Sequence, residues 1–175
     1  MIKESKNNHN AEPRNTSLSL NNQTKSKNKL RNKLECIMPE IFEKIIIRNT
    51  NQGKISKSRF DCSAKVKLSI KKYIIRLIKY TEAEDETLVH ALALIDKICL
   101  KEIYLSERNI YKLFLVSLIV SLKILEDEVY TDKHYASAGG ISVKEYSEIE
   151  ADFLALLDYK VQIDSKTLKI YFNSF

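Results

Sequence analysis

Apolar residues recur every three or four positions along most of the chain from Leu34 onward, which is the spacing of one buried face of an α-helix. Outside the expected loops, no stretch alternates between apolar and polar residues over the length of a useful strand. The pattern predicts one N-terminal helix from about Leu34, and five core helices over about 69–79, 81–100, 106–126, 142–157 and 168–172. The sequence therefore predicts an all-α fold.

The third core helix is expected to be the central one. Apolar side chains occupy nearly every side of it between Ile110 and Leu125, and a helix that is apolar all round is surrounded by others. Its longest apolar stretch, Leu113 to Leu122, has only 10 residues and contains two serines. A bilayer-spanning helix needs about 20 apolar residues, so this stretch indicates a buried helix and not a membrane anchor.

Residues 1–33 differ in composition, being rich in asparagine, lysine and serine and almost free of aliphatic side chains. Such a segment buries too little apolar surface to offset the entropy lost on ordering, so we expect a disordered basic tail. Its most basic part, Lys25 to Lys33, is compatible with a nuclear-import patch and equally with a solvated tail that no receptor binds.

We expect an N-terminal helix and a loop over 34–65, and the main domain over 66–175. The inner face of the N-terminal helix is expected to carry Ile37, Ile41, Ile45 and Ile46.

The chain carries a formal net charge of +6, and most of this charge lies in the tail. Residues 1–35 have a net charge of +5, whereas the remainder holds 21 basic and 20 acidic residues. A nucleic-acid-binding domain concentrates positive charge on a folded face, so the nearly neutral domain argues against that class. We therefore expect neither a nucleic-acid partner nor a membrane partner.

The N-terminal segment lacks the apolar core of a secretory signal peptide, so we expect an intracellular protein of the nucleus, the cytoplasm or both. The cysteines Cys36, Cys62 and Cys99 are widely spaced, without the spacing of metal ligands, which is typical of reduced thiols. The three histidines do not cluster near them in the sequence, so no metal site is expected.

The sequence pattern also argues against catalysis. Gly53, Gly139 and Gly140 are the only glycines, and they cannot form a phosphate-binding loop or a dinucleotide fingerprint, which need glycines at fixed offsets after a strand. The acidic residues between Glu82 and Glu86 mark an expected helix start, where the helix dipole favours negative charge. We therefore expect no enzyme activity and no cofactor.

Five segments between Ser69 and Gln162 stand in an order and at a spacing that carry a family resemblance. They are Ser-Ile-Lys-Lys-Tyr-Ile-Ile-Arg-Leu-Ile-Lys-Tyr-Thr (69–81), Leu-Ile-Asp-Lys (94–97), Ser-Leu-Lys-Ile-Leu-Glu-Asp (121–127), His134-Tyr135-Ala136 followed by Gly139-Gly140-Ile141-Ser142, and Glu148 to Asp158. Together they resemble the helical box of the cyclin family, and more closely the P/U-type cyclins related to the yeast phosphate-signalling cyclin. The loop with the two glycines is the most specific match. The resemblance implies a single five-helix cyclin box with an added N-terminal helix and tail.

The resemblance also implies a function and a contact surface. It indicates a regulatory subunit that binds a cyclin-dependent protein kinase as a heterodimer and activates it by holding the kinase's regulatory helix in the active position. In the family, a lysine at the end of the third helix and a glutamate on the fifth lie side by side and hydrogen-bond the kinase, and these correspond to Lys123 and Glu150. Leu125, Glu126 and Asp127 are further candidate contacts, although a solvated acidic helix end explains the last two equally well. The alternative function is a cyclin-fold adaptor that binds nucleic acid or acts in transcription without activating a kinase.

Other matching positions are expected to be structural. Arg76 and Asp96 resemble a buried pair that locks the first and second core helices together. His134, Tyr135, Gly139 and Gly140 are expected to shape the loop between the third and the next core helix.

Overall fold

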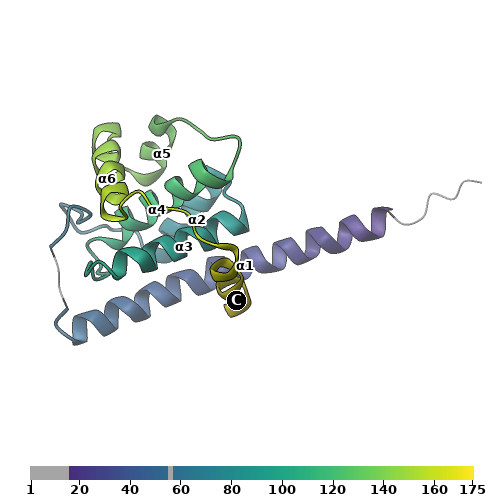
Figure 1. The fold of residues 1–175 in the computed structure, drawn as a ribbon, viewed down its shortest axis with the longest axis horizontal. Coiled ribbons are helices and arrows are strands. Elements are labelled where there is room, and N and C mark those ends of the chain that lie inside the picture. The colour runs from purple at the N-terminus through teal and green to yellow at the C-terminus, as the bar shows by residue number, and fades with distance from the viewer. Residues whose placement is uncertain (1–15, 55–56) are drawn as a thin grey trace, which may run out of the picture.

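The structure is a computed structural model that describes residues 16–54 and 57–175. These residues form seven α-helices and their connections, and they contain no β-strand. The predicted all-α fold class is confirmed. The helices, shown in Figure 1, are α1 (Thr16–Asn51), α2 (Ile70–Thr81), α3 (Asp85–Cys99), α4 (Ile110–Leu125), α5 (Asp132–Gly139), α6 (Val143–Leu156) and α7 (Ser165–Ser174).

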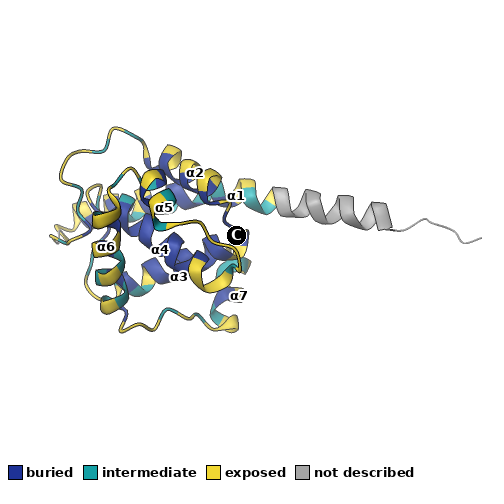
Figure 2. Cartoon of the chain, turned by 90° about the horizontal axis from the view of Figure 1, so that it is seen from above, coloured by how far each residue is buried: buried dark blue, intermediate teal, exposed yellow. Residues whose placement is uncertain are grey.

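Helix α4 lies at the centre, as its all-round apolar sequence predicts. Every residue from Lys112 to Leu122 is buried, and helices α2, α3, α5 and α6 pack around this stretch. Figure 2 shows α3 and α4 together as the buried middle of the fold. Burial of this many large aliphatic side chains supplies the main driving force for folding, at about 1.5–3 kcal/mol for each.

Short polar side chains mark where four of the helices begin. In each case a hydroxyl or carboxylate oxygen accepts a hydrogen bond from a backbone N–H of the first turn, which satisfies a donor that the helix itself leaves unpaired. These N-cap residues are Ser69 of α2, Thr131 of α5, Ser142 of α6 and Asp164 of α7.

Helix α1 is longer than predicted and uses a different buried face. It begins at Thr16 and not near Leu34, so residues 16–33, expected to be disordered, are helical, whereas residues 1–15 of the expected tail lie outside the described residues. The side chains packed on α2 and α3 are one position away from most of the predicted isoleucines: Leu34, Met38, Phe42 and Ile46 are buried, whereas Ile37, Ile41 and Ile45 are half-buried. Both sets repeat every four residues, so periodicity alone did not choose between them.

Arg31 attaches α1 to the bundle three residues upstream of the predicted start at Leu34. Its Nη2 donates to the carbonyl oxygen of Ala83 over 2.6 Å, and its Nε lies 2.6 Å from the carboxylate of Asp85 at the start of α3. Asp85 is buried, so the guanidinium group compensates a charge that would otherwise be costly to desolvate. This anchor holds α1 against α3 upstream of the predicted start.

Helix α5 was not predicted from the sequence, which assigned its residues to a loop. It spans eight residues, and the buried side chains among them are Tyr135, Ala136 and Ala138. Such a short segment gives too few apolar positions for a periodic signal. Thr131 before it and the left-handed Gly140 after it were the local signals of a helix.

Helix α7 packs against α3 and closes the bundle. The segment before it is held by Lys97, whose ammonium group donates to the carbonyl oxygens of Lys160 and Gln162. Among the helices of the described residues, none is both long enough and apolar enough to cross a bilayer.

Candidate partner-binding site

Lys123 lies at the point where the central helix reaches the surface. Its Nζ is 2.8 Å from Glu150 Oε1 on α6 and 2.9 Å from Asp132 Oδ1 at the start of α5. The lysine is in the last turn of α4, where the negative end of the helix dipole favours a cation. Three helices therefore converge on one ammonium group. The structure brings Lys123 and Glu150 together, and it adds Asp132, which the sequence analysis missed because it assigned this segment to a loop.

Tyr146 contacts these charged groups from the buried side. Its hydroxyl donates to Glu150 Oε1 over 2.5 Å, and its ring centroid lies 5.4 Å from Lys123 Nζ. Tyr146 is fully buried, whereas a third of the Lys123 side chain is exposed. The apolar pattern marks Tyr146 only as a core position. We call Lys123, Asp132, Tyr146 and Glu150 the lysine cluster.

Hydrogen bonds within the lysine cluster stabilise the protonated forms of Lys123 and Tyr146. Partial burial lowers the pKa of Lys123, but hydrogen bonds with Glu150 and Asp132 outweigh it, and the pKa ends above its ordinary value of 10.5. Burial, followed by the hydrogen bond to Glu150, raises the pKa of Tyr146 well above its ordinary value. Lys123 is therefore charged, and Tyr146 is a neutral donor, throughout the physiological range.

Apolar side chains are exposed directly after Lys123 in the chain. Ile124 and Leu125 end α4, and Val129 and Tyr130 follow in the connection to α5, each with 37–47% of its surface exposed. Exposed apolar residues that adjoin a charged cluster are typical of a surface that a partner covers. Leu125, a predicted contact, is thus accessible, as is Asp127.

Glu126, another predicted contact, is turned inward. Its Oε1 accepts hydrogen bonds from the backbone N–H of Glu84, 3.0 Å away, and from the hydroxyl of Thr87, 2.7 Å away. The carboxylate thus stabilises the positive N-terminal end of α3. Glu126 has a role within the fold, and we leave it out of the contact surface.

The predicted buried pair of Arg76 and Asp96 is wrong. Arg76 is exposed on α2, donates to the carbonyl oxygen of Ser137 over 3.2 Å, and lies over the ring of Tyr80. Asp96 is exposed on α3 and accepts a 2.5 Å hydrogen bond from the hydroxyl of Tyr171. The two residues therefore tie their helices to α5 and α7, respectively, and not to each other.

His134 and Tyr135 hold α5 in place. The Nε2 atom of His134 is 2.7 Å from the carbonyl oxygen of Tyr80, and its ring stacks on Tyr130 with centroids 4.3 Å apart. Tyr135 is fully buried, and its hydroxyl accepts a hydrogen bond from the backbone N–H of Tyr130. Both contacts fix the connection that places Asp132 beside Lys123.

Gly139 and Gly140 end α5 for two different reasons. A Cβ atom at Gly139 would overlap the side chain of Leu115, so glycine allows α5 to approach α4 closely. Gly140 has a φ of +75°, a left-handed conformation that is costly for residues with a Cβ. The two glycines thus set the distance from α5 to the core and the turn into α6.

Within residues 16–54 and 57–175, no three histidine, cysteine or carboxylate side chains are grouped in a way that would hold a metal ion. Cys36, Cys62 and Cys99 are free thiols, and burial raises the pKa of Cys99 to about 11.

Comparison with known proteins identifies the family of the chain. The model of the cyclin family matches residues 3–161, which is most of the chain. The chain belongs to the cyclin family. The matched region includes α1 and ends before α7, so it begins well upstream of residue 66, where the sequence analysis placed the start of the main domain.

Curated relatives of the chain include plant cyclins of the U and P types. The chain is 25% identical to Cyclin-U2-1 of Arabidopsis thaliana over 142 residues, which cover 77% of this chain and 64% of the relative. It is 30% identical to Cyclin-P3-1 of Oryza sativa subsp. japonica over 124 residues, which cover 70% of this chain and 52% of the relative. The predicted resemblance to P/U-type cyclins is confirmed. The chain spans between about half and two thirds of the length of these relatives.

Proposed function

We propose that this protein is a non-catalytic regulatory subunit that binds and activates a cyclin-dependent protein kinase through the surface around Lys123 and Glu150. Membership of the cyclin family supports a role in kinase regulation in general. The observation that carries the finer proposal is the 2.8 Å contact between Lys123 and Glu150 beside exposed Ile124 and Leu125. Such a surface combines directional hydrogen-bonding groups with apolar area, as protein interfaces commonly do.

The proposed mechanism is conformational. A kinase of this type populates an inactive arrangement, and a ligand that prefers the active one shifts the balance by its differential affinity. The ends of α4 and α6 would contact the kinase's regulatory helix and hold it inward. That position completes the lysine–glutamate pair that kinases need for phosphoryl transfer.

The test is co-expression with candidate cyclin-dependent kinases, followed by co-purification and a phosphorylation assay. Lys123→Ala leaves Glu150 without its cation on a covered surface, and such truncations cost about 2–5 kcal/mol of binding free energy. Co-purification with the kinase and phosphorylation by it should therefore both decrease. The matched control is Lys101→Ala, which removes another lysine–carboxylate contact, to Asp158 over 3.2 Å, away from the lysine cluster.

Two results would contradict the proposal. If Lys123→Ala and Glu150→Ala bind and activate as the unsubstituted chain does, this surface is not the contact. If the unsubstituted chain forms the complex but phosphorylation does not rise, the protein is an adaptor without activating function.

A further inference from the structure

Helix α2 presents an outward face that is strongly basic. Residues 62–81 include five lysines and one arginine, three of the lysines and the arginine lying on α2, and no aspartate or glutamate. The exposed residues of α2 repeat with helical spacing on the side away from α1 and α4, and α5 borders this side through Ser137 and His134. This basic stripe consists of Lys71, Lys72, Ile75, Arg76, Lys79 and Tyr80.

The lysines of the basic stripe are not neutralised within the fold. Among the described residues, no carboxylate lies within ion-pair distance of Lys71, Lys72 or Lys79. Arg76 donates to a backbone carbonyl and lies over the Tyr80 ring, and in the described part of the chain no carboxylate pairs with it either. Four cations along one helix repel one another in the free chain, and an anionic partner would relieve that repulsion.

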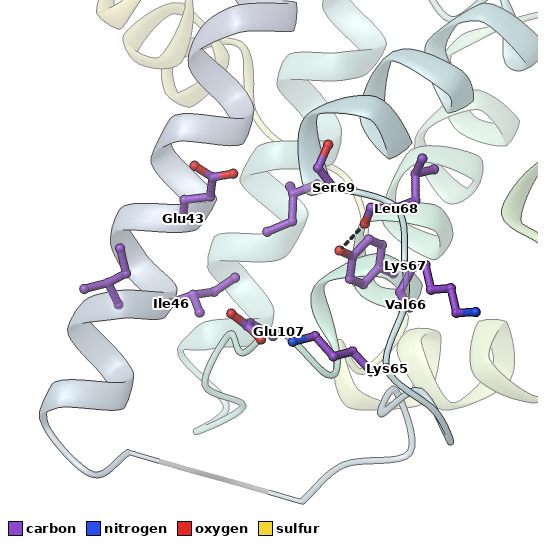
Figure 3. A pocket seen from close by; sticks show the side chains of 11 residues that line it. Glu43, Ile46, Lys65, Val66, Lys67, Leu68, Ser69 and Glu107 are labelled. Atoms are coloured by element: carbon purple, nitrogen blue, oxygen red, sulfur yellow. Dashed lines mark hydrogen bonds between the residues drawn. The ribbon is translucent and has the colours of Figure 1, made fainter.

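The neighbouring groove has a different character. It lies between α1 and the segment 65–70, with a volume of about 470 Å³, and Figure 3 shows the side chains that line it. Glu43 and Glu107 occur there together with Lys65 and Lys67, so its charges are balanced. In this region, the unbalanced positive charge therefore lies on α2 and not in the groove.

We propose that the basic stripe of α2 binds an acidic, extended segment of a partner protein. Successive cations on one side, such as Lys72 and Arg76, are about 6 Å apart along the helix axis. Alternate side chains of an extended peptide are about 7 Å apart, so carboxylates at every second position match this spacing. Ile75, 37% exposed between the cations, offers an apolar contact that a peptide side chain can use.

Nucleic acid fits the basic stripe less well. Proteins that bind single strands use open aromatic rings for base stacking. The Tyr80 ring is the aromatic group of the stripe, but the Arg76 guanidinium lies over it at 5.6 Å and the His134 ring adjoins it at 6.5 Å. An anionic membrane also fits less well, because a helix that lies on a bilayer needs a broad apolar face, and the apolar face of α2 is already buried in the bundle.

The experiment measures binding to the full chain alone, so it is independent of kinase binding. The probe is a fluorescent peptide in which glutamate alternates with serine around a central leucine, and the control peptide has glutamine in place of glutamate. Fluorescence anisotropy is recorded at low salt and at about 0.3 M salt, where screening shortens electrostatic reach to below about 8 Å. The variant is Lys71→Gln with Lys72→Gln and Lys79→Gln. The matched control removes the same charge elsewhere: Lys133→Gln, Lys166→Gln and Lys169→Gln. Circular dichroism verifies that both fold, as glutamine is a good helix former.

We expect the acidic peptide to bind at low salt and to dissociate at high salt. Neutralising three cations of the stripe should weaken binding by about tenfold, whereas the control triple variant should retain it. The proposal is overturned if the glutamine peptide binds equally well or if the stripe variant binds as the unsubstituted chain does. It is also overturned if duplex DNA or phosphatidylserine vesicles bind more tightly than the peptide and lose binding in the stripe variant.

Discussion

Tyr146 donates its hydroxyl proton to Glu150 over 2.5 Å, from one helical turn earlier on α6. The same carboxylate oxygen accepts from Lys123, so a buried phenol fixes the carboxylate from below while an ammonium group engages it from the side. The orientation of the proposed contact surface is thus tied to a core residue.

Replacing Tyr146 with phenylalanine should destabilise the fold while leaving its packing intact. The change removes a hydrogen bond to a charged group, worth about 1.5–3 kcal/mol, and should lower the free energy of unfolding by about that amount. Urea denaturation measures the loss. Tyr159→Phe is the control, because Tyr159 is 71% exposed and its hydroxyl should matter little. Equal stability of the two variants would show that the hydrogen bond from Tyr146 to Glu150 does not stabilise the fold.

The buried face of α1 is tested by two neighbouring substitutions. Leu34 is fully buried, so Leu34→Ala should lower the free energy of unfolding by about 2–5 kcal/mol. Ile37 is only half-buried, so Ile37→Ala should cost clearly less. Thermal unfolding of both variants, followed by circular dichroism, compares them. A larger loss for Ile37→Ala would favour the face expected from the isoleucine pattern.

The difference between the predicted and the observed buried face of α1 illustrates what the sequence predicts well and where it fails. Helical periodicity predicted α2, α3, α4 and α6 because each buries a long stripe of apolar residues. In α1 two stripes compete, and the choice depends on which helices lie opposite. A single sequence does not contain that information.

The lysine cluster, too, was predicted only in part from the sequence. The resemblance indicated Lys123 and Glu150, and the structure brings them together. Asp132 could be added only once α5 was known, and α5 is too short for periodicity to reveal. The Arg76 and Asp96 prediction failed because it joined two exposed residues whose partners, Ser137 and Tyr171, come from α5 and α7.

Gly139→Ala should destabilise the fold through a steric overlap with Leu115. Overpacking of this kind costs about 1–3 kcal/mol. A double-mutant cycle with Leu115→Ala identifies the cause, because Gly139→Ala should cost much less once the leucine side chain is absent. Additive losses, measured by urea denaturation, would rule out the overlap as the reason for glycine at this position.

Gly140→Ala should also destabilise the fold, but through backbone strain. A left-handed conformation costs about 1–2 kcal/mol for a residue with a Cβ, and no atom lies near enough to clash. Asparagine tolerates this conformation better, so Gly140→Asn should lose less stability than Gly140→Ala. The reverse order in thermal unfolding would mean that strain at Gly140 is not the cause.

His90 should make the protein less stable in mild acid. It is buried, with Nδ1 2.8 Å from Ser121 Oγ, and burial together with the charge of Lys97 lowers its pKa below the ordinary 6.5. Below pH 6.5 the unfolded chain takes up a proton that folded His90 does not, so stability falls by at most about 1.4 kcal/mol per pH unit for this group. His90→Gln should remove that part of the pH dependence in urea denaturation. An unchanged pH dependence would mean that another group is responsible.

Helix α4 is enclosed from Lys112 to Leu122, and the next residue along the chain is Lys123. The packing of the buried part of α4 therefore determines where that ammonium group lies. Any repacking that slides the helix by one residue carries the charge about 1.5 Å along the axis, away from the two carboxylates that α5 and α6 hold beside it. In related chains, the α4 interior and the proposed contact surface are then expected to change together, and a relative with an altered α4 interior would need compensating shifts in α5 and α6 to keep the lysine cluster together.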